Sequence, residues 1–449
     1  MLITHSDIRL FYKCPMLLYL SYHGPEDEMS VHPILKTRKR DSQSKELTYK
    51  QLASRINNTS IAMENEKRVV NQGWIGNKSY ASKVDNLERI QADSPSKSSV
   101  YVPIFYRSNP RAKKPLMMEG TFSTYILTEF YDNPVDYFVI RSKNGDTEYT
   151  VDGYQTELTS DLTLIYKLKS GEKTITPNYT RGCRVCEWRY YCRNLAAETL
   201  DLTLVSGIGK RAKKILFAHD ITDIPSLAKA DLSTLDDEEL IAKDLEYFKL
   251  QATSLMEKKA IIRKKLSLPN SKVELFVDVE GSSHHDFVWI IGCTIRRNGE
   301  VEYKSFIANS PKEEKSMMVS FLDFISNIDE SYTLYHWSAA EPQYFANLAA
   351  KYHLSLNVIR KIHNNSLDLF DIFKENIILP IYTYTLKDVA NWLGFKWHEP
   401  LTDGATSIIL FDNWYLRNDR KSLEKAIAYN SDDCKALLIA KDYVLKSLS

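Results

Sequence analysis

The chain has 449 residues, a hydrophobic content of 43%, a charged content of 26% and a formal net charge of +1. This length and balance indicate globular material in two or three domains and exclude a disordered chain. No apolar run approaches the roughly 20 residues of a membrane-spanning helix, and the N-terminus lacks the order of a signal peptide, so we expect no membrane association and a cytoplasmic location.

The first third of the chain has the pattern of an α/β domain. Ile8, Leu10 and Phe11 recur at helical spacing near the start. Strand-like runs follow at 100–107 and 135–142, and a helix is predicted between them. We place this domain at residues 1–196.

Four of the six cysteines lie in this first domain and are candidate metal ligands. Cys14 stands alone, whereas Cys183, Cys186 and Cys192 follow a C-x2-C-x5-C spacing. In a cytosolic chain, clustered cysteines indicate a metal site before a disulfide. Four thiolates suit Zn²⁺ or an iron–sulfur cluster equally on ligand type. A zinc ribbon normally has two C-x2-C pairs, and here there is one.

One distant cysteine followed by C-x2-C-x5-C resembles the iron–sulfur nucleases of the RecB type, which include CRISPR-associated members. The resemblance implies a PD-(D/E)xK-like α/β fold. It also implies a [4Fe–4S] cluster, in preference to zinc, that joins the N-terminal helix to the end of the nuclease domain. The implied cluster ligands are Cys14, Cys183, Cys186 and Cys192.

The same family has a nuclease motif that this sequence does not clearly contain. The family's strand carries an acid, one residue and then lysine, where this chain has Phe105 and Arg107. Asp93 is a candidate for the preceding acid, and Glu119 stands where the following helix would have glutamine. Phenylalanine cannot bind a metal, so we expect a degenerate nuclease site. The alternative is a site restored by carboxylates at other positions.

The middle of the chain, residues 197–268, has helical patterns and a Gly-Ile-Gly hairpin. Glycines let a backbone approach a phosphate closely, and N–H groups at a helix start can bind it. The segment 204–216 resembles a helix–hairpin–helix motif, which implies DNA binding, and its basic residues would attract any phosphate backbone. The alternative is a packing turn between helices. The candidate DNA-binding residues are Gly207, Gly209, Lys210, Arg211 and Lys213.

The last third of the chain begins with two apolar runs, 273–281 and 287–295, which predict buried strands joined by a polar turn. Asp278 and Glu280 lie two residues apart on the first strand, so their side chains face the same side. Burying two carboxylates side by side is unfavourable unless a cation is present. Mg²⁺ and Mn²⁺ prefer such oxygen ligands, and two-metal phosphodiester hydrolysis requires several of them in one pocket.

Further along the chain lie candidate partners for these two acids. Glu341 follows a strand-like run, and Tyr429 and Asp433 are four residues apart on a predicted helix, hence on one face. A carboxylate at the second position can bind a metal while the phenol orients the attacking water.

The order of these motifs resembles the DnaQ-like, RNase H-fold exonucleases of the DEDD type, and most closely a branch fused to RecB-type nucleases. The resemblance covers residues 269–449 and implies a 3′–5′ exonuclease with two Mg²⁺ or Mn²⁺ ions. It implies that Asp278, Glu280 and Asp433 bind metal and that Tyr429 orients water. The superfamily's second motif usually supplies aspartate, whereas Glu341 stands there in this chain. Asp368 is an alternative fourth ligand.

These motifs together predict a three-part DNA-processing enzyme, with a role in DNA repair. The substrate expected is DNA that is single-stranded or has a 3′ end, and RNA is not excluded because carboxylate-bound metals do not distinguish the sugar. Two alternatives stay open. In one, the first domain is the working nuclease. In the other, the chain is a non-catalytic subunit that binds nucleic acid.

Overall fold

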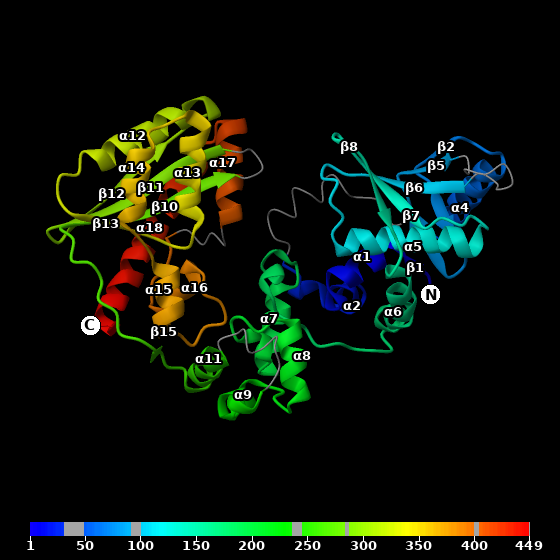
Figure 1. Cartoon of the computed structure of the whole chain (residues 1–449), viewed down its shortest axis with the longest axis horizontal. Helices are drawn as coiled ribbons and strands as arrows, with labels where there is room; N and C mark the ends of the chain where they lie inside the picture. Colours follow the sequence, from blue (N-terminus) through cyan, green and yellow to red (C-terminus); the bar gives the residue numbers. More distant parts are fainter. Residues whose placement is uncertain (31–48, 91–99, 236–244, 283–286, 399–403, 449) are drawn as a thin grey trace. The chain divides into compact units, whose positions relative to one another are not determined.

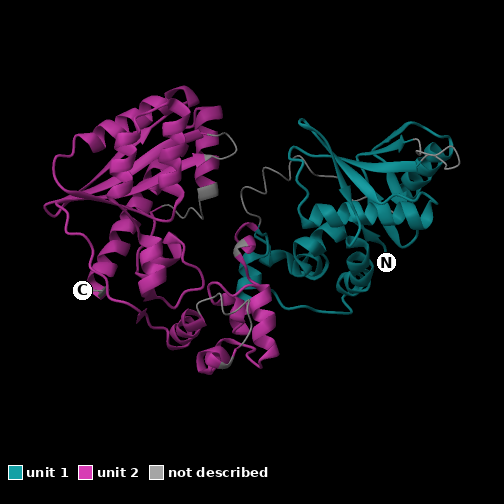
Figure 2. Ribbon diagram, viewed as in Figure 1, with its two compact units in different colours: residues 1–31, 39–177, 186–195 teal, residues 32–38, 178–185, 196–449 magenta. Residues whose placement is uncertain are grey.

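The computed structural model of the chain describes residues 1–30, 49–90, 100–235, 245–282, 287–398 and 404–448 (Figure 1). Helices and strands occur throughout, which confirms a mixed α/β multidomain protein. The chain divides into two compact units (Figure 2). The first holds the described residues up to 177 together with 186–195, and the second holds 178–185 and the described residues from 196 onward. No described helix is both long enough and apolar enough to cross a membrane.

The first unit contains a five-stranded sheet with the order β2-β5-β6-β7-β8 and a smaller sheet with the order β1-β4-β3. In the larger sheet β6 and β7 are parallel and the other pairs are antiparallel. The strands are β1 (Ile3–Thr4), β2 (Val69–Asn71), β3 (Trp74–Gly76), β4 (Tyr80–Lys83), β5 (Asn86–Ile90), β6 (Val100–Tyr106), β7 (Tyr137–Ser142) and β8 (Gly145–Thr150). The strands predicted at 100–107 and 135–142 are thus confirmed. The short strands between residues 69 and 90 were not predicted because their runs are too brief to show a period.

Helix α5 (Lys114–Phe130) is the helix expected between the two predicted strands, and it packs directly on the sheet. Gly120 permits this close packing, since a Cβ there would lie 2.3 Å from the ring of Phe138. The remaining helices that begin in this unit are α1 (His5–Lys13), α2 (Pro15–His23), η1 (Glu26–Glu28), α4 (Tyr49–Glu64), α6 (Tyr154–Ser170) and α7 (Arg189–Glu198).

The second unit contains a five-stranded sheet with the order β12-β11-β10-β13-β14. The first three strands in this order are antiparallel, and β10, β13 and β14 are parallel. The strands are β10 (Val273–Ser282), β11 (Phe287–Arg297), β12 (Glu300–Ile307), β13 (Tyr332–His336) and β14 (Ser366–Asp368). The two predicted buried strands are therefore confirmed as β10 and β11. Their long apolar runs fit strands that are covered on both faces.

Helices cover both faces of this sheet (Figure 1). On one face, Leu275, Val277 and Val279 of β10 pack with residues of α12 and α13. On the other face, Phe276 packs with residues of α15 and α18. The helices are η5 (Pro311–Glu313), α12 (Glu314–Ser326), α13 (Ala340–Tyr352), α14 (Leu356–Asn364), α15 (Leu369–Asn376), α16 (Leu386–Trp392), α17 (Gly404–Arg417) and α18 (Arg420–Leu448).

The helical region predicted at 197–268 is joined to this sheet domain within the second unit. A short strand, β9 (Ile261–Ile262), pairs with β15 (Ile377–Ile378), and Ile378 belongs to the core of the helical region. Gln251 Nε2 also donates a hydrogen bond to the Ile381 carbonyl at 3.1 Å. The helices of this region are η3 (Leu202–Leu204), α8 (Lys210–Ala218), α9 (Ile224–Lys229), η4 (Leu232–Thr234) and α11 (Leu245–Glu257), while η2 (Arg181–Val185) lies in the segment 178–185.

Candidate metal centre

The central strand of the second sheet, β10, carries the first two acids of the site. Its neighbours are β11 and β13, so the strand is buried along most of its length. Asp278 and Glu280 project on the same side as Phe276, toward α18, because alternate side chains of a strand share a face. A register shift between Glu280 and Gly281 interrupts the ladder with β11 directly after the second acid.

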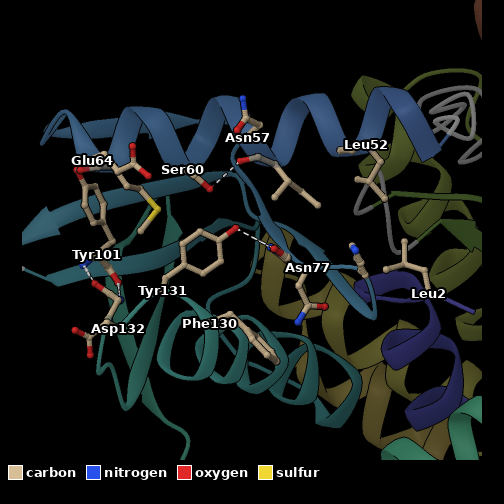
Figure 3. Close-up of a pocket in the computed structure, with 16 residues that line it drawn as sticks. Leu2, Leu52, Asn57, Ser60, Glu64, Asn77, Tyr101, Phe130, Tyr131 and Asp132 are labelled. Atoms are coloured by element: carbon tan, nitrogen blue, oxygen red, sulfur yellow. Dashed lines mark hydrogen bonds between the residues drawn. The ribbon is translucent and has the colours of Figure 1, made fainter.

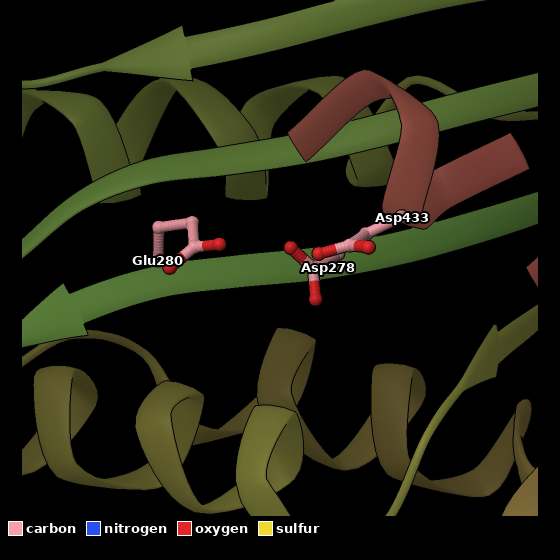
Figure 4. Close-up of side chains that lie close together, drawn as sticks. All are labelled: Asp278, Glu280 and Asp433. Atoms are coloured by element: carbon pink, nitrogen blue, oxygen red, sulfur yellow. The ribbon is translucent and has the colours of Figure 1, made fainter. Parts of the chain in front are cut away.

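The third acid, Asp433, comes from α18, which packs across β10 and β11. Carboxylate oxygens of Asp278, Glu280 and Asp433 all lie within 4.8 Å of one another (Figure 4). In the described part of the chain, no other group of three or more possible metal ligands is so close. Glu280 and Asp433 are each 7% exposed. The structure therefore brings together three carboxylates that are 155 residues apart at most along the chain (433 minus 278).

Without a cation, burial and mutual repulsion disfavour the ionised form of these acids. Burial, followed by the charges of Asp433, Glu280 and Glu341, raises the pKa of Asp278. Burial and Asp433 raise the pKa of Glu280 to about 8. Burial likewise raises the pKa of Asp433 to about 6. A bound divalent cation favours the charged form of each carboxylate and reverses these shifts.

A family model described as the RNase H superfamily matches residues 275–445. These residues form an RNase H-like domain. The match contains all but the first two residues of the five-stranded sheet and all three clustered acids, and it confirms the RNase H-like fold predicted for the last third of the chain. RNase H-like domains are generally phosphodiester hydrolases that use divalent metals, so a nuclease function is supported. No curated protein matches the chain.

Asn430 holds the first acid of the RNase H-like domain in place. Its Nδ2 donates to Asp278 Oδ2 at 2.7 Å, and its Oδ1 accepts a hydrogen bond of 2.8 Å from the Tyr303 hydroxyl. Asn430 fits because its neighbour on β11 is Gly292, where a Cβ would lie 1.7 Å from Asn430 Oδ1. Asn430, Tyr303 and Gly292 were missed in the sequence, because only the packing of α18 on β11 brings them together.

The other two acids accept hydrogen bonds from residues that sequence reasoning also missed. The Ser407 hydroxyl, on the buried side of α17, donates to Glu280 Oε2 at 2.6 Å. The Trp397 indole Nε1 donates to Asp433 Oδ1 at 2.7 Å. Both hydrogen bonds favour the ionised form of the acceptor and lower its pKa, against the larger effect of burial.

Glu341 lies beside the three clustered acids, in the first turn of α13. It is 6% exposed, and its Oε2 is buried without a hydrogen-bond partner. His336 Nδ1 is 3.8 Å from this oxygen. Burial, then the charges of Asp368, Glu280 and Asp433, raise the pKa of Glu341 to about 8. The charge of Glu341 thus interacts with those of the three clustered acids, although its oxygens lie outside the 4.8 Å group.

Asp368, the alternative fourth ligand, has a visible structural role at the end of β14. Its Oδ1 accepts hydrogen bonds from the backbone N–H groups of Ser338 at 2.8 Å and Phe370 at 2.9 Å. The first bond fixes the turn that leads into α13 and Glu341, and the second caps α15. Asp368 too lies outside the 4.8 Å group.

Tyr429 lies one turn before Asp433 on α18, so the two residues share a face of the helix, as the spacing of four predicts. The side chain is 3% exposed, and burial with the charges of Asp433 and Glu280 raises the pKa of its phenol. Lys387 Nζ lies 4.5 Å from the centre of the Tyr429 ring. Lys387 is in the segment that resembled the exonuclease family, but nothing in its spacing marked it as a site residue.

In the first unit, the expected remnant of a second nuclease site contains ion pairs. Arg9 binds both oxygens of the buried Glu119, at 3.0 and 2.7 Å. Arg107, on the strand end that carries Phe105, donates to Asp85 at 2.9 Å. Asp85 was not identified from the sequence, and Asp93, the acid considered there, lies outside the described residues.

The four candidate cluster cysteines all lie in the described part of the chain, and none of them forms a disulfide there. Cys14, Cys186 and Cys192 pack around one apolar cluster of the first unit that contains the buried Trp188. Cys183 belongs to the second unit, where its thiol accepts a hydrogen bond of 3.4 Å from the Thr180 N–H. The other two cysteines are fully buried in the RNase H-like domain, as expected of small core residues; they are Cys293 and Cys434.

The predicted Gly-Ile-Gly hairpin forms the turn between η3 and α8. The first element is thus a short 3₁₀ turn and not the full helix that the motif implies. Gly207 has φ of +98°, a conformation that favours glycine, and a Cβ there would also meet the ring of Phe248 at 2.9 Å. Gly209 is the N-cap of α8.

The three basic residues after the hairpin have different surroundings. Lys210 and Arg211 are exposed in the first turn of α8. The Lys213 side chain is only 12% exposed and forms an ion pair of 2.5 Å with Asp201. Its charge is therefore partly neutralised within the fold.

A cavity of about 870 Å³ in the first unit differs in character from a nuclease site (Figure 3). It lies between α4 and the end of α5, and Tyr131 and Asn77 project into it. Its charged lining residues in the described chain are Glu64, Lys78 and Asp132, which form no cluster of three acids.

Proposed function

We propose that the protein is a metal-dependent 3′–5′ exonuclease that acts on single-stranded DNA ends. The observation that carries the proposal is the close group of Asp278, Glu280 and Asp433 within an RNase H-like domain. Its supporting neighbours, Glu341 and Tyr429, stand in the order of the DEDD exonucleases. RNA remains an outcome of the test because the acids do not distinguish the sugar.

The residues of the site fit a pair of hard divalent cations. The buried carboxylates of Glu280 and Asp433, the half-buried one of Asp278, all with raised pKa values, and the unpartnered buried Oε2 of Glu341 are the groups that a cation would satisfy. We propose that Asp278, Glu280 and Asp433 hold Mg²⁺ or Mn²⁺, and that Glu341 takes precedence over Asp368 as the fourth acid. When bound, the ions supply activation of water and charge stabilisation at the phosphate.

The chain's own groups position the reactants. The phenol of Tyr429 stays protonated because its pKa is raised, so it can donate a hydrogen bond and hold the attacking water. Three donors keep the acids oriented, since each donates to one of them; they are Trp397, Ser407 and Asn430. Lys387 adds a positive charge beside Tyr429 that would favour the charge that develops on the phosphate.

The direct test measures degradation of single-stranded DNA, and of RNA of the same sequence, labelled at the 5′ or the 3′ end. With Mg²⁺ or Mn²⁺, we expect a 5′ label to remain on progressively shorter products and a 3′ label to appear at once in mononucleotides. Asp278→Asn should abolish the reaction and weaken Mn²⁺ binding in a titration without substrate. Asp323→Asn, an exposed acid on α12, is the matched control.

Hydrolysis that survives Asp278→Asn would contradict the site. It would favour the alternative in which the first domain is the nuclease. Salt-dependent binding without any metal-dependent cleavage would favour the non-catalytic subunit.

We also propose that the PD-(D/E)xK-like domain in residues 1–196 does not hydrolyse DNA. Arg107 forms an ion pair with Asp85, and Arg9 forms one with Glu119. The guanidinium groups neutralise these acids. A cation would have to displace both arginines. Glu119→Gln should therefore leave metal-dependent hydrolysis unchanged.

A [4Fe–4S] cluster on Cys14, Cys183, Cys186 and Cys192 is a further proposal. Its support is the gathering of Cys14 with Cys186 and Cys192 on one apolar cluster, although more than 170 residues separate them (186 minus 14 is 172). The preference for the cluster over zinc rests on the resemblance of the cysteine spacing to that of the RecB-type nucleases.

A further inference from the structure

A strongly basic segment leads from helix α11 toward strand β10 in the second unit (Figure 1). Residues 258–265, which we call the basic linker, contain five cations and no acid. Since the whole chain has a net charge of only +1, this segment is a marked local excess of positive charge. Such an excess attracts polyanions at long range. The five cations are Lys258, Lys259, Arg263, Lys264 and Lys265.

Hydrogen bonds hold the backbone of the basic linker in one conformation. At its start, the Lys259 N–H donates to the Ser254 carbonyl at 3.3 Å, and the Ser254 hydroxyl donates to the Lys259 carbonyl at 2.6 Å. In its middle, β9 pairs with β15. The Arg263 N–H then donates to the Asn376 carbonyl at 2.7 Å. The cations therefore project from a defined surface, so a partner that binds them pays little for ordering the chain.

Four of the five cations face solvent without a partner of opposite charge in the described chain. All four lysines are exposed, and none of them forms an ion pair with a described residue. Arg263 differs, because its guanidinium lies 3.6 Å from Glu246. Four neighbouring positive charges repel one another, and a bound polyanion would remove this repulsion.

The spacing of the lysines fits a phosphate backbone. They form two adjacent pairs, one on each side of β9, and five residues separate the inner members (264 minus 259). An extended chain covers this span in at most about 17 Å. A nucleic-acid strand has one phosphate about every 3.4 Å in a duplex, so a strand that crosses both pairs presents several phosphates to them. The RNase H-like domain in the same unit favours nucleic acid as the polyanion over a lipid surface.

The basic linker lies on the side of the sheet that carries the clustered acids. Ala260 of the linker and Leu268 just after it pack against the core cluster that contains Phe276. Asp278 projects on the same side of β10 as Phe276. It lies five residues after Val273, the start of the strand (278 minus 273), which is about 17 Å at about 3.3 Å per residue. The linker precedes this start, so a strand that reaches both sites has about five nucleotides or more.

We propose that the basic linker binds the phosphate backbone of the substrate strand several nucleotides away from the scissile bond. The proposal rests on the nuclease function proposed above and adds a second, sequence-independent contact for the body of the strand. Lysine suits this role because its ammonium group is a point charge on a flexible stem. The contact increases the affinity for long strands and leaves bond cleavage to the acids.

The first test is the affinity for a fluorescent single strand of about 15 nucleotides, long enough to reach the linker, measured by anisotropy in EDTA. The two variants are Lys258→Gln/Lys259→Gln and Lys264→Gln/Lys265→Gln. Each should reduce the slope of log K against log salt by about 1.4, from about 0.7 per lost phosphate contact, and raise Kd about twentyfold at about 0.1 M salt.

Lys312→Gln/Lys315→Gln is the matched control. These two exposed lysines lie at the start of α12, which packs on the opposite face of the sheet, so this variant should bind like wild type. All six lysines are exposed, and we expect the same melting temperature for every variant. Unchanged affinity and salt slope in both linker variants would overturn the proposal.

The second test compares strand lengths during hydrolysis with Mg²⁺. The linker variants should lower kcat/KM for the long strand and equal wild type on a strand of about three nucleotides, which does not reach the linker. An equal loss for both lengths would contradict a contact away from the scissile bond. Weaker binding to phosphatidylserine vesicles, with unchanged strand binding, would instead identify a lipid surface as the partner. Failure of the proposed hydrolysis is recognised separately, because the EDTA measurement does not depend on it.

Discussion

Lys387 is a cation placed among the acids of the RNase H-like domain. Its Nζ lies 4.5 Å from the Tyr429 ring centre and 5.5 Å from that of Trp397, and its charge lowers the pKa of Glu280 and Asp433. We expect Lys387→Met to lower kcat about 10²-fold, as loss of one charged group at a developing phosphate charge does. Lys387→Arg should recover part of this loss.

The same substitution should move the pH profile of hydrolysis. Without the lysine charge, the pKa values of Glu280 and Asp433 rise, so the acidic limb of the profile should shift to higher pH. Steady-state kinetics between about pH 5 and 9, the range in which perturbed carboxyl groups titrate, measure both effects, with Lys312→Met as the control. A Lys387→Met enzyme with unchanged kcat and an unshifted limb would show that Lys387 is a packing residue.

The titration of the acids also predicts how the metal-free protein responds to pH. The pKa of Glu280 is raised from its ordinary value of 4.5 to about 8, so its folded state binds a proton more tightly than its unfolded state. Its stabilising contribution is complete below about pH 4.5 and is lost as pH rises through 8. The loss amounts to at most about 5 kcal/mol, from about 1.36 kcal/mol per pKa unit.

Denaturant unfolding in EDTA at about pH 5 and about pH 8 tests this titration. The free energy of unfolding of wild type should decrease from about pH 5 to about pH 8. The decrease should be larger than that of Glu280→Gln, whose side chain cannot titrate. Adding Mg²⁺ should restore wild type at the higher pH and leave Glu280→Gln largely unaffected. Parallel curves for the two proteins in EDTA would contradict the raised pKa.

At the scale of elements, the site depends on how closely α18 packs on β11. Gly292 makes room for Asn430, which in turn holds Asp278. In Gly292→Ala the new methyl group would overlap Asn430 Oδ1, so the amide must leave its position. We expect a destabilisation of about 1–3 kcal/mol, typical of overpacking, together with weaker Mn²⁺ binding.

A double variant isolates the cause of this effect. The double variant Gly292→Ala/Asn430→Ala removes the overlap. Its loss of unfolding free energy should therefore be smaller than the sum of the losses in the two single variants. Chemical denaturation measures the cycle, and Mn²⁺ titration reports on Asp278. Additive single effects would mean that the Gly292–Asn430 contact does not set the packing.

The elements that could be predicted are those with a strong local pattern. The apolar runs of β10 and β11 and the alternation that pairs Asp278 with Glu280 are visible in the sequence, as is the spacing of Tyr429 and Asp433. The supporting groups could not be predicted, because they reach the acids only through long-range packing; they are Asn430, Trp397 and Lys387. Asp85 was missed for the same reason, since the short strands around it have no recognisable period.

At the scale of the whole molecule, a net charge of +1 hides local charge that matters. Lys210 and Arg211 are exposed beside the hairpin, while acids concentrate at β10 and α18. The contacts of Gln251 and β9 join the predicted domains 197–268 and 269–449 within one compact unit, and the boundary between them stays a prediction.

The cysteine set makes the remaining prediction, because a cluster there would join the two ends of the first domain. Cys14 lies between α1 and α2 and packs on the cluster that contains Trp188 and Cys192. Cys14→Ser should remove the brown colour, visible absorbance and bound iron of the purified protein. Without this link the first unit should unfold at a temperature lower by about 5 °C or more.

Iron and zinc analysis with calorimetry measures these changes, and Cys293→Ala is the control. Cys293 is buried in β11, so its removal should lower the stability of the second unit and leave the iron content unchanged. One zinc per chain, in place of iron, would contradict the cluster.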